Sequence, residues 1–284
     1  MKEKQKERIK KVFFPFIKLL ISNKVSWKLI TYFIDIITWL KYEKSKLDHL
    51  KAVNKLEMYF EDKVVCSGFF KGLKYLNFNS VGSSIFPKLL GSYEMELIPI
   101  FNLFKNNNYK TIVDIGCAEG FYTVGLALQF KKAKIYAYDI NEKALELCAK
   151  LAEHNQVRNR IVLNSKCEAE TLNQLNLSNR NLIICDCEGY ERELFKSSNS
   201  NNLKHADLII ELHPFYSVDV KQYLISLFIN SHNCSIISSL DNVRKLSELQ
   251  DRLSGLTKME QHKAVEEGRP YTMDWLIAES NIYK

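Results

Sequence analysis

The chain has 284 residues, of which 46% are hydrophobic and 26% charged, and its formal net charge at pH 7 is +7. This composition excludes a disordered or fibrous protein, and the length suits one α/β domain with a smaller attachment. Seven cysteines without a Cys-x-x-Cys pair disfavour a disulfide framework and indicate free thiols in a reducing compartment.

The positive charge is concentrated in the N-terminal segment, which begins with a dense basic run from Lys2 to Lys11. Residues 1–46 hold 12 Lys/Arg and 4 Asp/Glu, a net charge of +8, so the remaining 238 residues carry −1. A main domain that is close to neutral disfavours a nucleic-acid partner.

Residues 25–40 are strongly apolar and aromatic, with polar residues at spacings of three and four that predict an amphipathic helix. Its apolar runs are shorter than the 18 or so residues that a membrane span needs, and no signal-peptide cleavage site follows. We interpret residues 1–60 as a basic helical segment. Two interpretations stay open: a lid or homodimer contact, or a peripheral membrane contact through residues 1–46 on the inner face. In either case the expected location is cytoplasmic.

Residues 61–109 form a lead-in segment before the first core strand. Within it, residues 91–104 predict a helix that Pro99 bends or restarts.

Residues 110–123 predict a buried strand that ends at Asp114, then a turn and a helix that begins at Tyr122. Gly116 and Gly120 stand in the turn, without the middle glycine that a dinucleotide fingerprint places against a pyrophosphate. An acid at the end of the strand suits a cationic ligand better than a phosphate. The segment therefore predicts a small-molecule pocket and disfavours a nicotinamide cofactor.

A second strand, residues 133–141, ends in Asp139, about 20 to 25 residues after the glycine turn, where an acid accepts ribose hydroxyls. A helix follows with Asn141 as its N-cap, and residues 160–164 predict a third strand.

The fourth and fifth strands bring acids and a histidine to one edge of the sheet. Residues 181–191 place Asp186 and Glu188 at a strand end, and residues 206–214 place Glu211 and His213 at the next. The carboxyl ends of parallel strands face the ligand crevice of an open sheet.

Three motifs together resemble the FkbM family of class I S-adenosylmethionine-dependent methyltransferases: Asp-Ile-Gly-Cys-Ala-Glu-Gly at 114–120, Asp-Cys-Glu-Gly-Tyr-Glu at 186–191 and Ile-Glu-Leu-His at 210–213. The resemblance covers residues 111 to about 215. The chain departs from it at Cys187, where the family commonly has an aliphatic residue, and at Asp139-Ile140, where Glu-Pro is more common.

The resemblance implies a Rossmann-like α/β fold over residues 110–284, with seven strands of which the last is antiparallel. It also implies O-methylation of a hydroxyl on a sugar, polysaccharide or secondary metabolite. Two alternatives stay open: N-methylation of a small molecule or peptide, and a non-catalytic cofactor-binding or membrane-attached scaffold.

The resemblance further implies a S-adenosylmethionine site made by the glycine turn, the end of the second strand and the adenine region behind the third. The residues are Asp114, Gly116, Cys117, Ala118, Glu119, Gly120, Phe121, Asp139, Ile140, Glu168, Ala169 and Asp186. Helices in front of the first strand often roof this cofactor, which would place Tyr93 and Glu94 near its methionine end.

Asp186, Glu188 and His213 are the candidate catalytic residues facing the acceptor. His213 has the ordinary pKa best suited to a base near neutrality. Mg²⁺ is a candidate at the acids, but we expect no metal.

The C-terminal part predicts a helix over residues 219–230 and strands over 234–240 and 273–279. The polar stretch from Asp241 to Pro270 resembles an insertion between the last two strands, and we expect it to border the acceptor pocket. Leucines at helical spacing from Leu246 to Leu256 indicate that it is ordered.

Overall fold

The computed structural model describes residues 14–15, 17–215, 219–269 and 271–283. The basic run from Lys2 to Lys11 lies outside these residues. The chain divides into two compact units, residues 1–55 and residues 56–284. Helix α2 (Lys24–Tyr59), most of which belongs to the first unit, confirms the helix predicted over residues 25–40 and continues beyond it. Among the described residues, no helix combines the length and apolarity needed to cross a bilayer.

The second unit is built on a seven-stranded sheet with the strand order β3-β2-β1-β4-β5-β7-β6. The strands are β1 (Thr111–Ile115), β2 (Lys134–Tyr138), β3 (Ile161–Asn164), β4 (Asn181–Cys185), β5 (Ala206–Leu212), β6 (His232–Ser238) and β7 (Asp274–Ser280). Strands β1 to β5 pair in parallel, whereas β7 lies antiparallel between β5 and β6. The predicted Rossmann-like sheet with an antiparallel last strand is confirmed.

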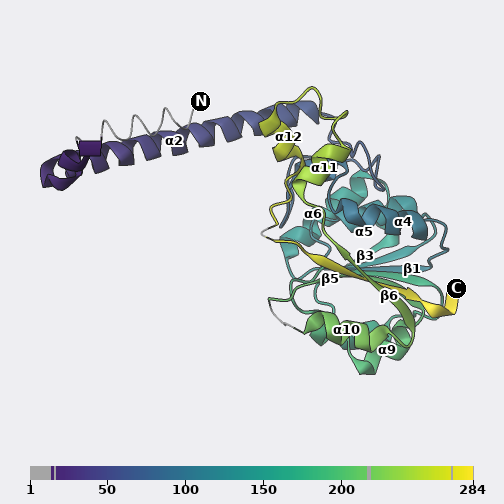
Figure 1. Ribbon diagram of the computed structural model, residues 1–284. Coiled ribbons are helices and arrows are strands. Elements are labelled where there is room, and N and C mark those ends of the chain that lie inside the picture. The colour runs from purple at the N-terminus through teal and green to yellow at the C-terminus, as the bar shows by residue number, and fades with distance from the viewer. Residues whose placement is uncertain (1–13, 16, 216–218, 270, 284) are drawn as a thin grey trace. The chain divides into compact units, whose positions relative to one another are not determined.

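Helices cover both faces of this sheet (Figure 1). Helices α4 (Ile98–Phe104), α5 (Phe121–Gln129) and α6 (Glu142–His154) lie on one face, and α9 (Ser197–Leu203) and α10 (Val220–Phe228) on the other. The shorter helices are α3 (Ile85–Leu90), α7 (Ala169–Gln174), α8 (Glu191–Leu194), α11 (Asn242–Glu248) and α12 (Lys258–Val265).

The two-sided cover explains the composition of the central strands. Every residue of β4 and β5 is buried, and both strands read as nearly continuous apolar runs. One polar exception has a structural role: Asp207 in β5 accepts from Tyr109 Oη at 2.7 Å and from Ser280 N at 2.9 Å. Asn141 caps α6 as predicted, because its side chain accepts from the N–H groups of Lys143 and Ala144.

The helix expected to begin at Gly91 instead begins at Ile98, after a 3₁₀ turn over Met95–Leu97. Gly91 has φ 82° and Glu94 has φ 48°, left-handed values that a continuous α-helix excludes. Pro99 stands in the first turn of α4, where its missing N–H costs no hydrogen bond.

The described part of the insertion between β6 and β7, residues 241–269, has regular structure, as expected, in helices α11 and α12. Leu249, Leu253 and Leu256 are buried in the turns that join these two helices.

Candidate functional site

The glycine turn connects β1 to α5 and packs directly on the end of β4. Gly116 has φ 84°, and a Cβ there would lie 1.6 Å from the carbonyl oxygen of Asp186. Gly120 has φ 99°, and its Cβ would lie 2.7 Å from Cys148 Sγ in α6. Both glycines are therefore required by close approach as well as by conformation.

Asp139, the predicted ribose acid, lies against this turn. Its Oδ2 accepts from the N–H of Ala118 at 2.8 Å, and its Oδ1 accepts from the N–H of Asn141, also at 2.8 Å. A carboxylate has about four acceptor positions, so two remain for the hydroxyls of a ligand. The neighbouring Ile140 side chain is 81% exposed and so offers an uncovered apolar surface beside the acid.

Asp114 lies buried at the end of β1, where its Oδ2 accepts a hydrogen bond from Thr123 Oγ1. Burial raises the pKa of Asp114 to about 7, opposed by the Thr123 hydrogen bond and assisted by the charge of Asp139. Because its pKa is near neutrality, this carboxyl would be pulled into its ionised form by a cationic ligand group.

Glu119 serves the interior of the protein. Its carboxylate is paired with buried Lys88 and accepts from Ser80 Oγ and Val81 N, each at 3.0 Å. Burial raises the pKa of Glu119, but Lys88 and these donors outweigh it, and the pKa lies below its ordinary value. Both carboxylate oxygens are engaged, so only the backbone of Glu119 remains for a ligand in the turn.

The other turn residues are small, apolar or packed. Cys117 is buried, and the N–H groups of Gly116 and Cys117 donate to Tyr138 O at 2.9 and 3.0 Å. The Phe121 ring packs edge-on against Phe70 and Tyr93, with centroids 5.1 and 5.4 Å apart. These contacts fix the turn before any ligand binds.

Glu168, the predicted adenine contact, lies exposed at the start of α7 and pairs with Lys166 Nζ at 2.8 Å. No hydrogen bond or ion pair among the described residues joins it to the glycine turn. Ala169, next in the chain, is buried.

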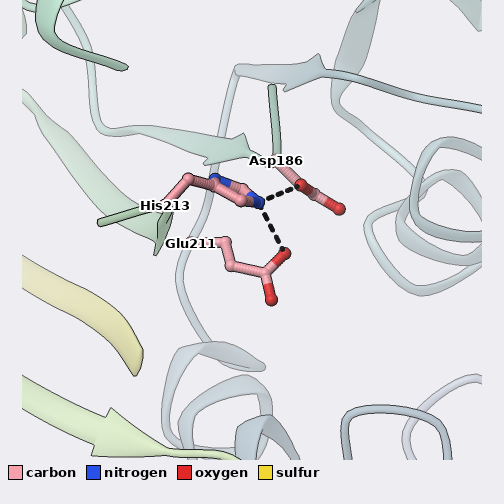
Figure 2. Close-up of side chains that lie close together, drawn as sticks. All are labelled: Asp186, Glu211 and His213. Carbon is pink, nitrogen blue, oxygen red and sulfur yellow. Dashed lines mark ion pairs between the residues drawn. The ribbon is translucent and has the colours of Figure 1, made fainter. Parts of the chain in front are cut away.

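The second cluster, which we call the acceptor edge, surrounds His213 after β5. His213 Nε2 lies 3.5 Å from Asp186 Oδ1, 3.6 Å from Glu188 Oε2 and 3.8 Å from Glu211 Oε2. Figure 2 shows the imidazole between the carboxylates of Asp186 and Glu211. The three predicted catalytic residues are thus brought together, with Glu211 as a fourth member.

Glu191, at the start of α8, orients the histidine. Its Oε1 lies 2.6 Å from His213 Nδ1, and both side chains are buried. Burial lowers the pKa of His213, but the hydrogen bond to Glu191 and the charges of Glu191, Glu211 and Glu188 raise it above its ordinary value. The raised pKa favours the protonated imidazole over the neutral one.

Burial and the charges of Glu211 and Glu94 raise the pKa of Asp186 well above its ordinary value. The acceptor edge therefore holds more carboxylates than its single histidine can neutralise, and it favours binding of a cation or a proton.

Arg269, from the insertion, binds three buried carboxylates. It donates to Glu94 Oε1 at 2.6 Å, to Glu211 Oε1 at 2.5 Å and to Glu267 Oε2 at 2.9 Å. Glu94 also accepts from Tyr122 Oη in α5. The sequence indicated only a polar insertion, because Arg269 is separated from Glu94 by 175 positions.

A cleft of about 340 Å³ adjoins this arginine. It is lined by residues 239–242, Lys245, residues 266–269, Tyr271 and Thr272. Since Arg269 and Glu267 belong to both the cleft wall and the carboxylate cluster, the cleft borders the acceptor edge. Its polar and charged lining suits a hydrophilic molecule.

Comparison with known proteins agrees with this architecture. A family profile described as "Methyltransferase domain" matches residues 106–249, half of the chain, from just before β1 through β6 and into the insertion. The "Uncharacterized protein MG259 homolog" of Mycoplasma pneumoniae is 28% identical over 130 residues, which cover 44% of this chain and 27% of the relative. The chain therefore spans about a quarter of the length of that curated relative.

Solved structures that are similar to the chain have low sequence identity to it. The O-methyltransferase TomG from Streptomyces achromogenes, solved in complex with S-adenosylmethionine, is 10% identical with a TM-score of 0.46, covering 67% of this chain and 82% of its own. A precorrin-6y C5,15-methyltransferase from Geobacter metallireducens is 11% identical with a TM-score of 0.41, covering 65% and 89%. Such values do not identify a substrate.

Proposed function

Because the chain belongs to the methyltransferase-domain family, we propose that it transfers the methyl group of S-adenosylmethionine to a hydroxyl oxygen of a sugar, polysaccharide or secondary metabolite. The three motifs at 114–120, 186–191 and 210–213 support placing it in the FkbM group. The observation that carries the proposal is the contact between Gly116 and the backbone of Asp186, since it joins the cofactor turn to the acceptor edge.

The residues of the turn fit the proposed cofactor. Asp139 has free acceptor positions for two ribose hydroxyls, and Asp114 becomes a carboxylate where an ammonium group can neutralise it. Because the glycine motif lacks the middle glycine of a dinucleotide fingerprint, it offers no cradle for a pyrophosphate. The site therefore suits an adenosine with a zwitterionic amino-acid tail better than a dinucleotide.

Positioning supplies much of the rate of such a transfer. When bound, the cofactor supplies an electrophilic methyl group, and the electrons of its carbon–sulfur bond return to sulfur. The acceptor edge has to hold a hydroxyl oxygen in line with that bond and accept its proton. A general base adds on the order of 10²- to 10⁴-fold.

The carboxylates are the proton acceptors that this geometry favours. The raised pKa of His213 favours its protonated form, so this residue is a weaker candidate for the base than its ordinary pKa suggests. Asp186 has a raised pKa and is the stronger acceptor when ionised. Glu188, with a side chain 79% exposed, can release a proton to solvent.

We propose the cleft beside Arg269 as the entrance for the acceptor. Its lining includes Asp241, Asn242 and Thr272, which can exchange hydrogen bonds with a hydroxyl-rich molecule. An apolar metabolite would leave these groups unpaired on binding.

Calorimetric titration of the whole chain with S-adenosylhomocysteine and, in parallel, with NADH tests the proposal. We expect micromolar binding of the first alone, and at least a tenfold loss of affinity in Asp139→Ala because hydrogen bonds to a charged group are removed. Asp62→Ala, which removes an exposed carboxylate distant in sequence from Asp139, is the matched control. Unchanged affinity in Asp139→Ala would contradict the ribose assignment.

Turnover with hydroxyl acceptors distinguishes the alternatives. Methylation of amines alone would indicate the N-methyltransferase, and cofactor binding without turnover on any acceptor would indicate a scaffold.

We also propose that the N-terminal unit contacts an anionic membrane surface on the cytoplasmic side. Considered by itself, α2 exposes large apolar side chains, among them Trp27 (46%), Phe33 (61%) and Trp39 (59%). Lysines accompany them, and residues 1–46 carry a net charge of +8. Helices that bind at a membrane interface combine such aromatic residues with basic ones, and each basic residue adds about 1 kcal/mol to the free energy of binding near an anionic surface.

Flotation of the whole chain with vesicles tests this contact. We expect binding to vesicles that contain anionic lipid, weaker binding to neutral ones, and loss of binding in Trp27→Ser/Trp39→Ser. A concentration-dependent dimer without vesicle binding in analytical ultracentrifugation would instead support the homodimer, and a monomer that loses its fold on deletion of residues 1–46 would support the lid.

A further inference from the structure

We propose that Asp186, Glu211 and His213 bind one divalent transition-metal ion at the edge of the sheet where β4 and β5 end (Figure 2). The use of this ion in methyl transfer rests on the proposed function, whereas its binding does not.

The spacing of the donor atoms is the first observation. One ligand atom from each residue lies within 4.8 Å of the others. His213 Nε2 is 3.5 Å from Asp186 Oδ1 and 3.8 Å from Glu211 Oε2, which are long for hydrogen bonds. Two ligands bound to one ion at about 2.1 Å in tetrahedral geometry are separated by roughly 3.4 Å. The side chains are therefore spaced as ligands around a common centre.

A buried oxygen without a hydrogen bond is the second observation. Asp186 Oδ1 is buried, and no described residue gives it a hydrogen bond, since its ion-pair partner His213 Nε2 lies 3.5 Å away. A buried carboxylate oxygen without a hydrogen bond is costly, because it has lost its hydration without a full replacement. This oxygen faces His213 Nε2, so an ion between them would satisfy both atoms.

Neighbouring residues orient the ligands in the manner of a metal site. Glu191 lies 2.6 Å from His213 Nδ1, which fixes the imidazole with Nε2 toward the cluster. Metal-binding histidines commonly donate their other N–H to a carboxylate in this way. Arg269 holds Glu211 Oε1, which leaves Oε2 for the centre.

The ligand set selects the class of ion. One imidazole with carboxylates suits Mn²⁺, Fe²⁺ or Zn²⁺, whereas Mg²⁺ and Ca²⁺ prefer oxygen alone. Glu188 Oε2 lies 3.6 Å from Nε2 on an exposed side chain, and so can bind the ion directly or through water. The side of the site next to Glu188 faces solvent, so it would leave coordination positions of the ion for the hydroxyl of an acceptor.

Within the proposed function, the ion would polarise the acceptor. A hydroxyl bound to it loses its proton more readily. The proton passes to Glu188 and then to water, the oxygen forms its bond to the methyl carbon, and the electrons of the broken carbon–sulfur bond remain on sulfur.

Titration of the chelator-treated whole chain with Mn²⁺, followed by electron paramagnetic resonance, tests the site directly. We expect one bound ion and at least a tenfold weaker affinity in Asp186→Asn, Glu211→Gln and His213→Asn. Glu153→Gln, an exposed carboxylate on α6, is the matched control and should bind like the unmodified chain. Thermal melting monitored by circular dichroism establishes that each variant is folded.

Two results would overturn the site: a folded, unmodified chain that binds neither Mn²⁺ nor Zn²⁺ at millimolar ion, or folded variants that bind as the unmodified chain does. S-adenosylhomocysteine is titrated against the same samples. Cofactor binding without metal binding would refute the metal site alone, and metal binding without cofactor binding would refute the proposed function alone.

Discussion

The glycine turn and the acceptor edge lie in contact but are satisfied in opposite ways. At the turn, Asp139 accepts hydrogen bonds from two backbone N–H groups and Glu119 pairs with Lys88, so both side chains are fixed in place before a ligand arrives. At the acceptor edge, carboxylates crowd one imidazole and Asp186 Oδ1 has no hydrogen bond from the described residues. The glycine turn is preorganised before a ligand binds, whereas the acceptor edge favours the binding of a further cation or a proton.

The strongest test of the turn's rigidity is Gly116→Ala. A Cβ at 1.6 Å from Asp186 O, on a residue with φ 84°, forces the turn and the end of β4 apart. We expect a loss of at least about 5 kcal/mol in the free energy of unfolding, measured with urea, or no folded protein. Gly255→Ala, where a Cβ meets nothing within 4 Å, should change it by less than about 1 kcal/mol. Equal losses in the two variants would show that the turn is not tightly packed.

Asp114 tests whether the turn carries one unsatisfied charge. Its folded pKa, about 7, is raised above the ordinary value of 3.8. The stability it contributes is therefore present below about pH 4 and lost as the pH rises through about 7, by about 4 kcal/mol. Urea unfolding from pH 4 to 8 should show this fall in the ligand-free chain and a smaller one in Asp114→Asn. Parallel curves for the two proteins would contradict the raised pKa.

His213→Gln separates the two regions functionally. Because His213 belongs to the acceptor edge and not to the turn, we expect kcat to fall by on the order of 10²-fold while the affinity for S-adenosylhomocysteine changes by less than about threefold. His154→Gln, at the exposed end of α6, should leave both unchanged. A loss of cofactor affinity as large as the loss of kcat would show that the regions are not separate.

The smallest expected effect is at Glu168, whose exposed carboxylate pairs only with Lys166 in the described structure. Glu168→Gln should weaken S-adenosylhomocysteine binding by less than about tenfold, since an amide still accepts from the adenine amine. An S-adenosylhomocysteine analogue altered at N7 or N6 of adenine should lose no more affinity for the variant than for the unmodified chain. A more than tenfold loss of S-adenosylhomocysteine affinity in calorimetry would show that Glu168 belongs with the preorganised residues of the turn.

The sequence predicted the turn better than the acceptor edge because their interactions differ in range. Strand, glycine and acid follow one another from Asp114 to Asp139, so local spacing was enough. His213 was also recoverable, since parallel strands end at one edge. Glu94 and Arg269 come from two segments that lie 175 positions apart in the sequence, and no local pattern pairs them.

Glu119 shows the limit of the motif itself. Its place in the glycine motif pointed to the ligand, but buried Lys88 on α3 turns its carboxylate inward. Likewise, the helix expected from Gly91 begins at Ile98, since Glu94 has a left-handed backbone, and its buried carboxylate contacts Arg269 and Tyr122. In both cases an ion pair between residues distant in sequence accompanies the departure from the local pattern.

The three ion pairs of Arg269 affect the order in which the two regions can form while the chain is being translated. The glycine turn and Asp139 leave the ribosome about 130 residues before Arg269 does, and the turn's hydrogen bonds involve only residues already made. The carboxylates of Glu94 and Glu211 lack their ion-pair partner until Arg269, which follows both in the sequence, has been translated. A nascent chain paused within the insertion would therefore hold a complete glycine turn beside an acceptor edge that lacks its arginine, and we expect proteases to cleave that incompletely folded edge more readily.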